Sequence, residues 1–414
     1  MRAGTTLLLL AALCAAEEAG GAGKALPFDW RQLGGSATHA DSREQKDSVA
    51  VPRVLWHAPQ AVGQPTLLGG WIYSGGPLLG RIAASTGKFE KAHAADTRAV
   101  GATPVITDDA IIVRRPDGAV EAYSHDLRKQ IWQTPTLAPE VHAAHPLAWH
   151  ERFVVLNAGN DVLALRARDG KIQWRFSTRK GEVAMTPAIA DGRVFFGCVA
   201  GGVWAFELAS GRQLWHLAGR EHYGYSNPVV SGAKLVLADR GINYAGQPGR
   251  AGLLHGIDAA RGKILWSLPY GKHRISTPGV ANNRIVLGTH KRVFLVDLSL
   301  GKQVLPRITI ESGAFGTPAI VGSTLYFGTD GGYLHARDLR TGSLKWRLRI
   351  PGKQPNNRPQ VPGKRPNNRP HEVRSIVHTG TRIYVETTNG LYCLGQDPNR
   401  RGVRPQNETI TAPE

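Results

Sequence analysis

The chain has 414 residues, 49 of them glycine, and a formal net charge of +19. This length exceeds the usual size of one compact core, so a repeating architecture or several domains are expected. The charge favours acidic partners, but no nucleic-acid-binding motif accompanies it, so nucleic acid is not predicted as a ligand.

Residues 1–23 predict a signal peptide. Arg2 gives a positive start, Thr5–Leu13 is a short apolar run, and small residues follow it. The run is too short to cross a bilayer, and no transmembrane segment is predicted elsewhere. A periplasmic or secreted protein is therefore expected, with lipidation of Cys14 as the alternative.

Residues 24–50 form a lead-in segment, of which 29–42 are polar and loop-like. An ordered lead-in that lies across the main body, anchored by Trp30, is one interpretation. A flexible leader is the other, and the sequence leaves both open.

Four short strands separated by turns are predicted between Thr186 and Trp215. The turns are Asp191-Gly192, Gly201-Gly202 and a segment ending at Gly211, and the runs between them are rich in Val, Phe and Ala. The tryptophan of the fourth strand recurs at Trp132, Trp174, Trp215, Trp266 and Trp346, and a first-strand proline recurs from Pro65 to Pro318. Both markers repeat at intervals of about 40 residues, the period of a β-propeller blade.

Seven complete units end near Lys91, Trp132, Trp174, Trp215, Trp266, Leu305 and Trp346. After them, 373–395 contains three strands and no fourth. Arg53–Trp56, ahead of the first unit, matches Lys263–Trp266 closely and supplies the missing strand. We therefore predict an all-β, eight-bladed propeller of four-stranded antiparallel blades over 51–398, closed by both chain ends.

The copies differ in quality. Lys91 and Arg128 stand where better copies have Trp and Gly, and blade 5 has an enlarged loop over Asp239–Gly252. A basic, Pro- and Asn-rich insertion at 350–372 contains a tandem duplication, and a disordered tail is expected over 399–414. Cys198 and Cys393 fall on opposite blades, so no disulfide is predicted.

The units TPAIADGRVFFGCVAGGVWAFELASGRQLW and GTPAIVGSTLYFGTDGGYLHARDLRTGSLKW resemble pyrroloquinoline-quinone-type β-propeller repeats, over nearly all of the mature chain. In that family the repeat tryptophans dock between neighbouring blades. The resemblance gives this structural role to Trp56, Trp132, Trp174, Trp215, Trp266 and Trp346.

The resemblance implies three functions. The leading one is an exported, non-enzymatic scaffold that is expected to be a monomer and to bind a protein or an anionic envelope polymer such as a polysaccharide. The alternatives are a quinone-dependent dehydrogenase or its degenerate relative, and a subunit of the outer-membrane protein assembly machinery. The dehydrogenases carry an adjacent Cys pair, which this sequence lacks, and no Ca²⁺ ligand set can be assembled, so neither quinone nor metal is predicted.

A ligand site, if the propeller has one, is expected on the face that carries the loops between the fourth and first strands and between the second and third strands. No catalytic residue is predicted. The candidates to ring one mouth of the channel there are Glu182, His222, Tyr223, Tyr225, Asp239, Arg240, His273, Arg274 and His290. Asp169 and Asp258 are interpreted as turn residues, and His255 and His335 as packing or surface positions.

Overall fold

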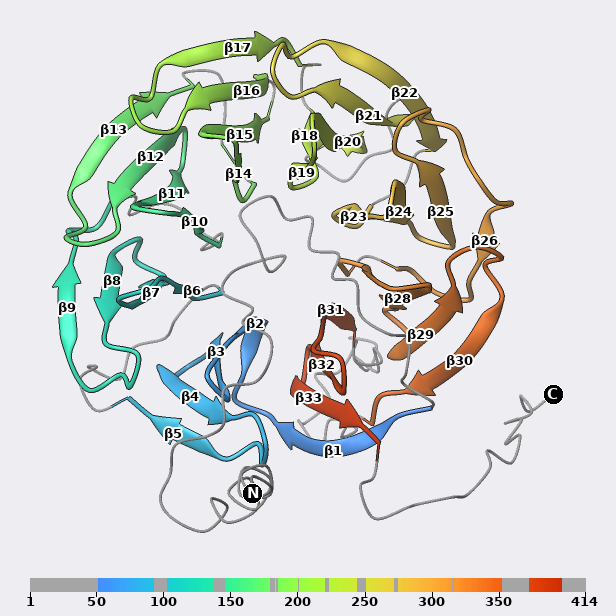
Figure 1. The fold of residues 1–414 in the computed structure, drawn as a ribbon, viewed down its shortest axis with the longest axis horizontal. Helices are drawn as coiled ribbons and strands as arrows, with labels where there is room; N and C mark the ends of the chain where they lie inside the picture. Colours follow the sequence, from blue (N-terminus) through green and yellow to red (C-terminus); the bar gives the residue numbers. More distant parts are fainter. Residues whose placement is uncertain are drawn as a thin grey trace, which may run out of the picture.

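The computed structural model describes residues 51–92, 103–137, 146–178, 183, 185–199, 201–219, 223–243, 251–271, 275–314, 316–351 and 372–396. Within them, eight antiparallel sheets stand around a common centre like the blades of a propeller (Figure 1). The predicted fold class is confirmed. The predictions for 1–50, 352–371 and 397–414, which include the signal peptide, most of the basic insertion and the tail, lie outside the described residues.

Blades 1 to 4 each contain four consecutive strands. Blade 1 is β2 (Val62–Leu68), β3 (Trp71–Gly75), β4 (Gly80–Ala83) and β5 (Phe89–Lys91), and blade 2 is β6 (Val105–Ile106), β7 (Ile111–Arg114), β8 (Val120–Tyr123) and β9 (Gln130–Gln133). Blade 3 is β10 (Ala148–His150), β11 (Phe153–Ala158), β12 (Asp161–Arg166) and β13 (Ile172–Ser177), and blade 4 is β14 (Ala188–Ala190), β15 (Arg193–Cys198), β16 (Gly202–Glu207) and β17 (Gln213–Leu217).

Blade 5 has an additional strand. It contains β18 (Tyr223–Tyr225), β19 (Val229–Ser231), β20 (Lys234–Asn243), β21 (Gly252–Asp258) and β22 (Ile264–Gly271). Blade 6 is β23 (Gly279–Ala281), β24 (Arg284–Gly288), β25 (Arg292–Asp297) and β26 (Ile308–Thr309), and blade 7 is β27 (Ala319–Val321), β28 (Thr324–Gly328), β29 (Tyr333–Asp338) and β30 (Leu344–Arg349). Blade 8 is β31 (Val373–His378), β32 (Arg382–Thr387) and β33 (Gly390–Gly395), completed by β1 (Arg53–Ala58).

The ring closes as the sequence predicts. β1 runs antiparallel to β33, with Trp56 opposite Cys393 and His57 opposite Tyr392, and the two strands lie side by side in Figure 1. The His57 and Tyr392 rings stack at 4.1 Å between centroids. The first described strand thus covers an edge of the last blade that would otherwise be free to pair with another chain.

Turn chemistry explains why the sequence forms these meanders. Asp191 and Gly192 both have positive φ, +48° and +68°, the type I′ geometry that joins two twisted strands through two residues. Asp258 accepts the backbone N–H groups of Ala260 and Arg261, both at 2.9 Å, and Asp169 accepts that of Lys171 at 3.2 Å. The interpretation of Asp169 and Asp258 as turn residues is confirmed.

The fourth-strand tryptophans reach from one blade to the next. Their indole N–H groups donate to backbone oxygens of the following blade, Trp56 to Ala84, Trp132 to Ala167, Trp174 to Leu208, Trp215 to Ala259 and Trp266 to Leu298, at 2.7–3.1 Å. Trp346 is buried in the cluster shared by blades 7 and 8. Each bond contributes about 1 kcal/mol net, and the buried indole surface adds to it.

Two local features differ from the sequence prediction. Asp239–Asn243 continues β20 instead of opening a loop, because Tyr223 and Tyr225 pair with Asn243 and Asp239 and extend the sheet. In blade 2, the left-handed turn residue is Leu127, with φ +59°, and not Arg128 at the glycine position. The residue with positive φ in this turn therefore lies one position earlier than in the blades that have glycine there.

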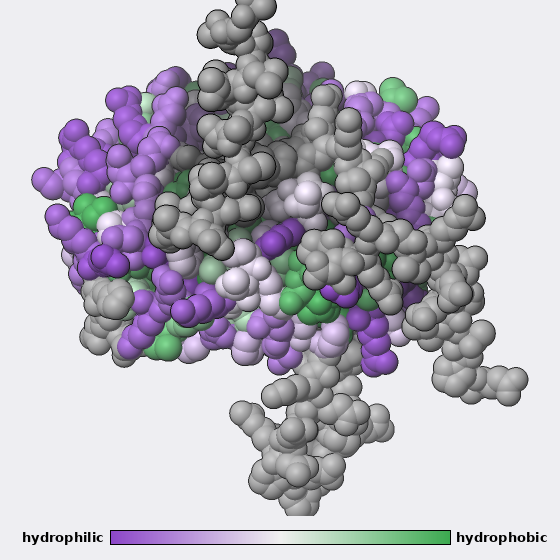
Figure 2. All heavy atoms as spheres, turned by 60° about the horizontal axis from the view of Figure 1, so that its bottom comes forward, coloured by the Kyte–Doolittle hydropathy of each residue, from purple (hydrophilic) through white to green (hydrophobic). Residues whose placement is uncertain are grey.

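Cys198 and Cys393 are buried in blades 4 and 8, as predicted, and form no disulfide bond with each other. The part of the chain that the structure describes contains no helix that could cross a bilayer. Large apolar side chains that remain exposed, such as Ile172, Leu265 and Leu344, lie mainly on outer strands. Figure 2 shows one side of the molecule as mainly hydrophilic, with apolar residues in small separate spots.

Candidate functional site

The loops predicted to share one face do lie together. The backbone N–H of Val183, after blade 3, donates to Gly159 in the second turn of that blade, and Ala314, after blade 6, donates likewise to Thr289. Of the nine candidate residues, Glu182, His222, His273 and Arg274 lie outside the described residues, and Tyr223 and Arg240 are described only as backbone in β18 and β20. Tyr225, Asp239 and His290 can be placed in full.

Two of these three side chains are inside the protein. Tyr225 is buried in the cluster shared by blades 4 and 5, where its ring fills the space beside Gly197. Asp239 is also buried, accepts the backbone N–H of Leu253, and lies 3.8 Å from the Nε2 atom of His255. Both groups bind neighbouring strands instead of facing an open mouth, whereas His290 is exposed at the second turn of blade 6.

Sequence reasoning missed a set of buried polar residues at equivalent positions near the ends of the second strands. Gly197, Gly288 and Gly328 occupy this position in blades 4, 6 and 7, and an added Cβ on each would touch the following blade or the connection that leads to it. Blades 2, 3 and 8 instead have Arg114, Asn157 and Glu386 there. Alignment of the repeats could have identified them, because a polar residue replaces a small one.

These polar residues connect neighbouring blades. Arg114, only 1% exposed, donates from Nη1 to Asn157 Oδ1 at 2.9 Å, and Asn157 donates to the backbone oxygen of Met185 at 3.3 Å. Burial lowers the pKa of Arg114 to about 10, so it stays a cation at neutral pH. Glu386 accepts the N–H of Gly63 at 2.9 Å across the ring closure, and burial raises the pKa of its carboxyl group.

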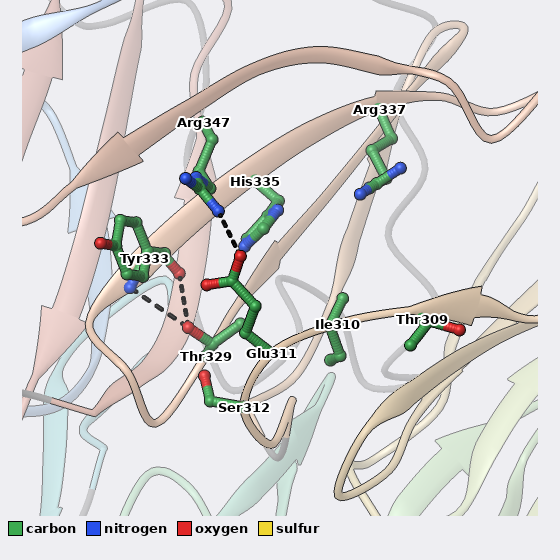
Figure 3. A pocket seen from close by; sticks show the side chains of 9 residues that line it. All are labelled: Thr309, Ile310, Glu311, Ser312, Thr329, Tyr333, His335, Arg337 and Arg347. Carbon is green, nitrogen blue, oxygen red and sulfur yellow. Dashed lines mark hydrogen bonds and ion pairs between the residues drawn. The ribbon is translucent and has the colours of Figure 1, made fainter. Parts of the chain in front are cut away.

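A cavity of about 220 Å³ opens between blades 6 and 7, and we call it the blade 6–7 pocket. Tyr333, His335 and Arg337 alternate along β29 and so project from one of its faces, and Arg347 stands opposite His335 on β30. Glu311 and Ser312 enter from the connection that follows β26. Figure 3 shows His335 between the two arginines, with Glu311 reaching toward Arg347.

The pocket is a mixed but positively charged environment. Arg347 Nη1 lies 3.2 Å from Glu311 Oε1, and its guanidinium carbon is 4.7 Å from the centre of the Tyr333 ring. His335 is 7% exposed and stacks on Phe327 at 4.8 Å. Burial, reinforced by the charges of Arg337 and Arg347, lowers the pKa of His335 from 6.5 to about 4, so its imidazole is neutral at pH 7.

Blade 6 departs from the repeat in its fourth strand, next to the pocket. The fourth strand of blade 6 has Leu305 in place of the docking tryptophan, and the side chains of Leu305 and Ile308 both approach the turn glycine Gly342, at 3.4 Å from a Cβ built there. The strand itself is reduced to Ile308–Thr309. Blades 2 to 5 have a tryptophan at the position of Leu305, so blade 6 combines a smaller side chain with a shorter strand there.

Comparison with known proteins supports the repeat assignment. A family model described as "Outer membrane protein assembly factor BamB" matches residues 46–239, 117–346 and 231–408, which together cover most of the chain. The chain belongs to this family.

The BamB family includes curated relatives with moderate similarity to this chain. Outer membrane protein assembly factor BamB of Shewanella oneidensis is 25% identical over 242 residues, covering 54% of this chain and 57% of the relative. BamB of Burkholderia pseudomallei is 25% identical over 257 residues, covering 58% and 61%. The matches thus span less than two thirds of these relatives.

Solved structures show the same fold. A quinohemoprotein alcohol dehydrogenase of Pseudomonas putida superposes with a TM-score of 0.67 at 12% identity, covering 92% of this chain and 84% of that one. At this identity the likeness concerns the fold and not the chemistry.

Within the described ranges, no three His, Cys, Asp or Glu side chains come close enough to hold a metal ion. Asp239 and Glu386, two buried carboxyl groups, are already bound to backbone N–H groups of their own or the adjacent blade. These two carboxyl groups are therefore engaged in hydrogen bonds within the ring.

Proposed function

We propose that this protein is a non-catalytic scaffold of the bacterial cell envelope that binds a protein partner during outer-membrane protein assembly. The observation that carries the proposal is membership of the BamB family over most of the chain, together with relatives that bear this name. The proposal includes export under the direction of residues 1–23 and function without bound quinone.

The construction of the ring is consistent with this role. Tryptophan bonds connect five pairs of successive blades, and buried polar residues connect blades 2 to 3, 3 to 4 and 8 to 1. A binding protein benefits from such rigidity, because a preformed surface loses little conformational entropy when its partner docks. The net charge of +19 adds attraction for acidic partners.

Depletion of the protein in its source organism tests the proposal. We expect the amount of folded β-barrel proteins in the outer membrane to fall, and re-expression of the full chain to restore it. Unchanged barrel levels would contradict the assembly role.

A second assay separates the scaffold from an enzyme. The purified chain is incubated with pyrroloquinoline quinone and Ca²⁺, passed through a desalting column, and tested for quinone absorbance and for dye-linked alcohol oxidation. The proposal predicts neither retained quinone nor turnover. Retained quinone with turnover would show a dehydrogenase.

A further inference from the structure

The blade 6–7 pocket replaces apolar packing that neighbouring blades use at the same place. The positions of His335 and Arg337 face the preceding blade, and three other blades have apolar residues at both equivalent positions. These residues are Leu163 and Leu165 in blade 3, Trp204 and Phe206 in blade 4, and Phe294 and Val296 in blade 6. Blade 5 has one polar residue there, His255, which bonds to Ser267 at 2.8 Å. Blade 7 has two polar residues that face a cavity.

These two side chains hold hydrogen-bonding atoms without partners. The Nε atom of Arg337 and the Nδ1 atom of His335 are buried and make no hydrogen bond, although Arg337 Nη1 donates to its own turn at Gly342. Burying polar atoms in this way costs free energy unless a ligand or water satisfies them. The pocket is therefore prepared to bind a group that accepts hydrogen bonds.

The charges of the pocket specify which group. Arg337 and Arg347 carry two positive charges, the imidazole of His335 is neutral at pH 7, and Glu311 carries the one negative charge among the lining residues. Glu311 is 78% exposed and reaches inward to a single guanidinium. A carboxylate thus already occupies the mouth of the pocket, while the deeper Arg337 has none.

We propose that the blade 6–7 pocket binds a carboxylate from an acidic segment of a protein partner, which displaces Glu311 from Arg347 and reaches Arg337. The ligand's carboxylate accepts from both guanidinium groups, and its stem packs against Tyr333 and Ile310. This site deepens the proposed scaffold role, on which the choice of a protein as the carrier of the carboxylate rests.

The size of the pocket is sufficient for this ligand. A volume of 220 Å³ equals the space of about seven water molecules in the liquid. One carboxylate with a short aliphatic stem fits, and a folded domain does not. The partner therefore contributes one side chain or chain end to this pocket, and any wider contact lies around it.

Titration of the full chain with two short peptides tests the site. Acetyl-Gly-Glu-Gly-amide and its neutral glutamine counterpart are compared by isothermal titration calorimetry, with inorganic phosphate as a third probe. We expect the glutamate peptide to bind, and the other two probes to bind at least about tenfold more weakly. The glutamine peptide lacks the charge that strengthens the hydrogen bonds to arginine, and phosphate lacks the planar geometry of a carboxylate.

Three variants make the test specific. Arg347→Gln should weaken the glutamate peptide about tenfold or more, and Glu311→Gln should strengthen it, because the internal competitor is removed. Arg175→Gln is the matched control: Arg175 follows Trp174 in blade 3 as Arg347 follows Trp346, and it pairs with Asp161 away from the pocket. It should leave binding unchanged.

Each other result overturns a defined part of the account. Equal binding of the two peptides, tighter binding of phosphate, or equal effects of Arg347→Gln and Arg175→Gln would overturn the carboxylate site. If the peptide does not bind but depletion lowers the amount of barrel proteins, the carboxylate site is refuted and the assembly role stands. If the peptide binds but barrel levels stay normal on depletion, the assembly role is refuted and the carboxylate site stands.

Discussion

The neutral state of His335 makes the stability of this propeller sensitive to acid. In the unfolded chain a histidine takes up a proton near pH 6.5, whereas in the folded protein the pKa of His335 is about 4. The unfolded state therefore binds more protons below pH 6.5, and stability is lost as the pH falls from 6.5 toward 4. The groups that face His335 are Arg347 on β30, Arg337 and Tyr333 on β29, and Glu311 from the connection after β26.

The magnitude follows from the pKa difference. It amounts to about 2 kcal/mol of lost unfolding free energy at pH 5 and about 3 kcal/mol at pH 4. The variant His335→Phe removes this contribution, and it places at position 335 the residue that blade 6 has as Phe294, next to the Phe327 ring. The carboxyl groups of the protein titrate in both chains, so their effects cancel in the comparison.

Urea denaturation at pH 7, 6 and 5 measures the effect. We expect the wild-type chain to lose about 2 kcal/mol more than His335→Phe between pH 7 and pH 5, with unchanged denaturant slopes. Parallel losses in the two chains would refute the reasoning, because His335 would then titrate equally in the folded and unfolded states.

Three further predictions concern the ring itself. Gly211→Ala should lower the urea midpoint more than its control Gly192→Ala. Both glycines have positive φ, +71° and +68°, but a Cβ on Gly211 lies 2.6 Å from the Trp174 ring, whereas a Cβ on Gly192 touches nothing within 4 Å. Equal shifts of the midpoint in the two variants would contradict the docking contact. Trp174→Phe removes the donor to Leu208 and should cost about 1–2 kcal/mol in the same assay, and an unchanged midpoint would show that the bond is dispensable. A chain that starts at Pro59 lacks β1, so one edge of β33 is left without a partner strand. We expect this chain to have a lower Tm and to associate, as measured by light scattering. A monodisperse chain with an unchanged Tm would argue against closure by β1.

The sequence predicted the fold through residues whose role is local and repeated. A tryptophan in most fourth strands, and in most blades a glycine four residues before that position, recur because the glycine of one blade contacts the tryptophan of the preceding blade. The match between Arg53–Trp56 and Lys263–Trp266 identified the closing strand, and Trp56 does pair beside Tyr392 and Cys393. Because such contacts repeat at a regular spacing along the chain, the sequence alone is enough to detect them.

The candidate site was less predictable because it depends on contacts between blades. Tyr225 was assigned to an open mouth, but its side chain fills the space that Gly197 leaves in blade 4, which its own loop sequence does not reveal. The blade 6–7 pocket is lined by Glu311 and Ser312, which follow blade 6, and by His335 and Arg337 of blade 7, and the repeat pattern predicts none of these side chains. Only the ring brings these departures from the repeat together.

Identification of the partner tests the scaffold role most directly. The full chain with a C-terminal affinity tag is crosslinked in living cells of the source organism, purified under denaturing conditions and analysed by mass spectrometry against an unrelated tagged envelope protein. We expect strong enrichment of components that insert β-barrels into the outer membrane. Equal recovery of those components with the control protein would contradict it.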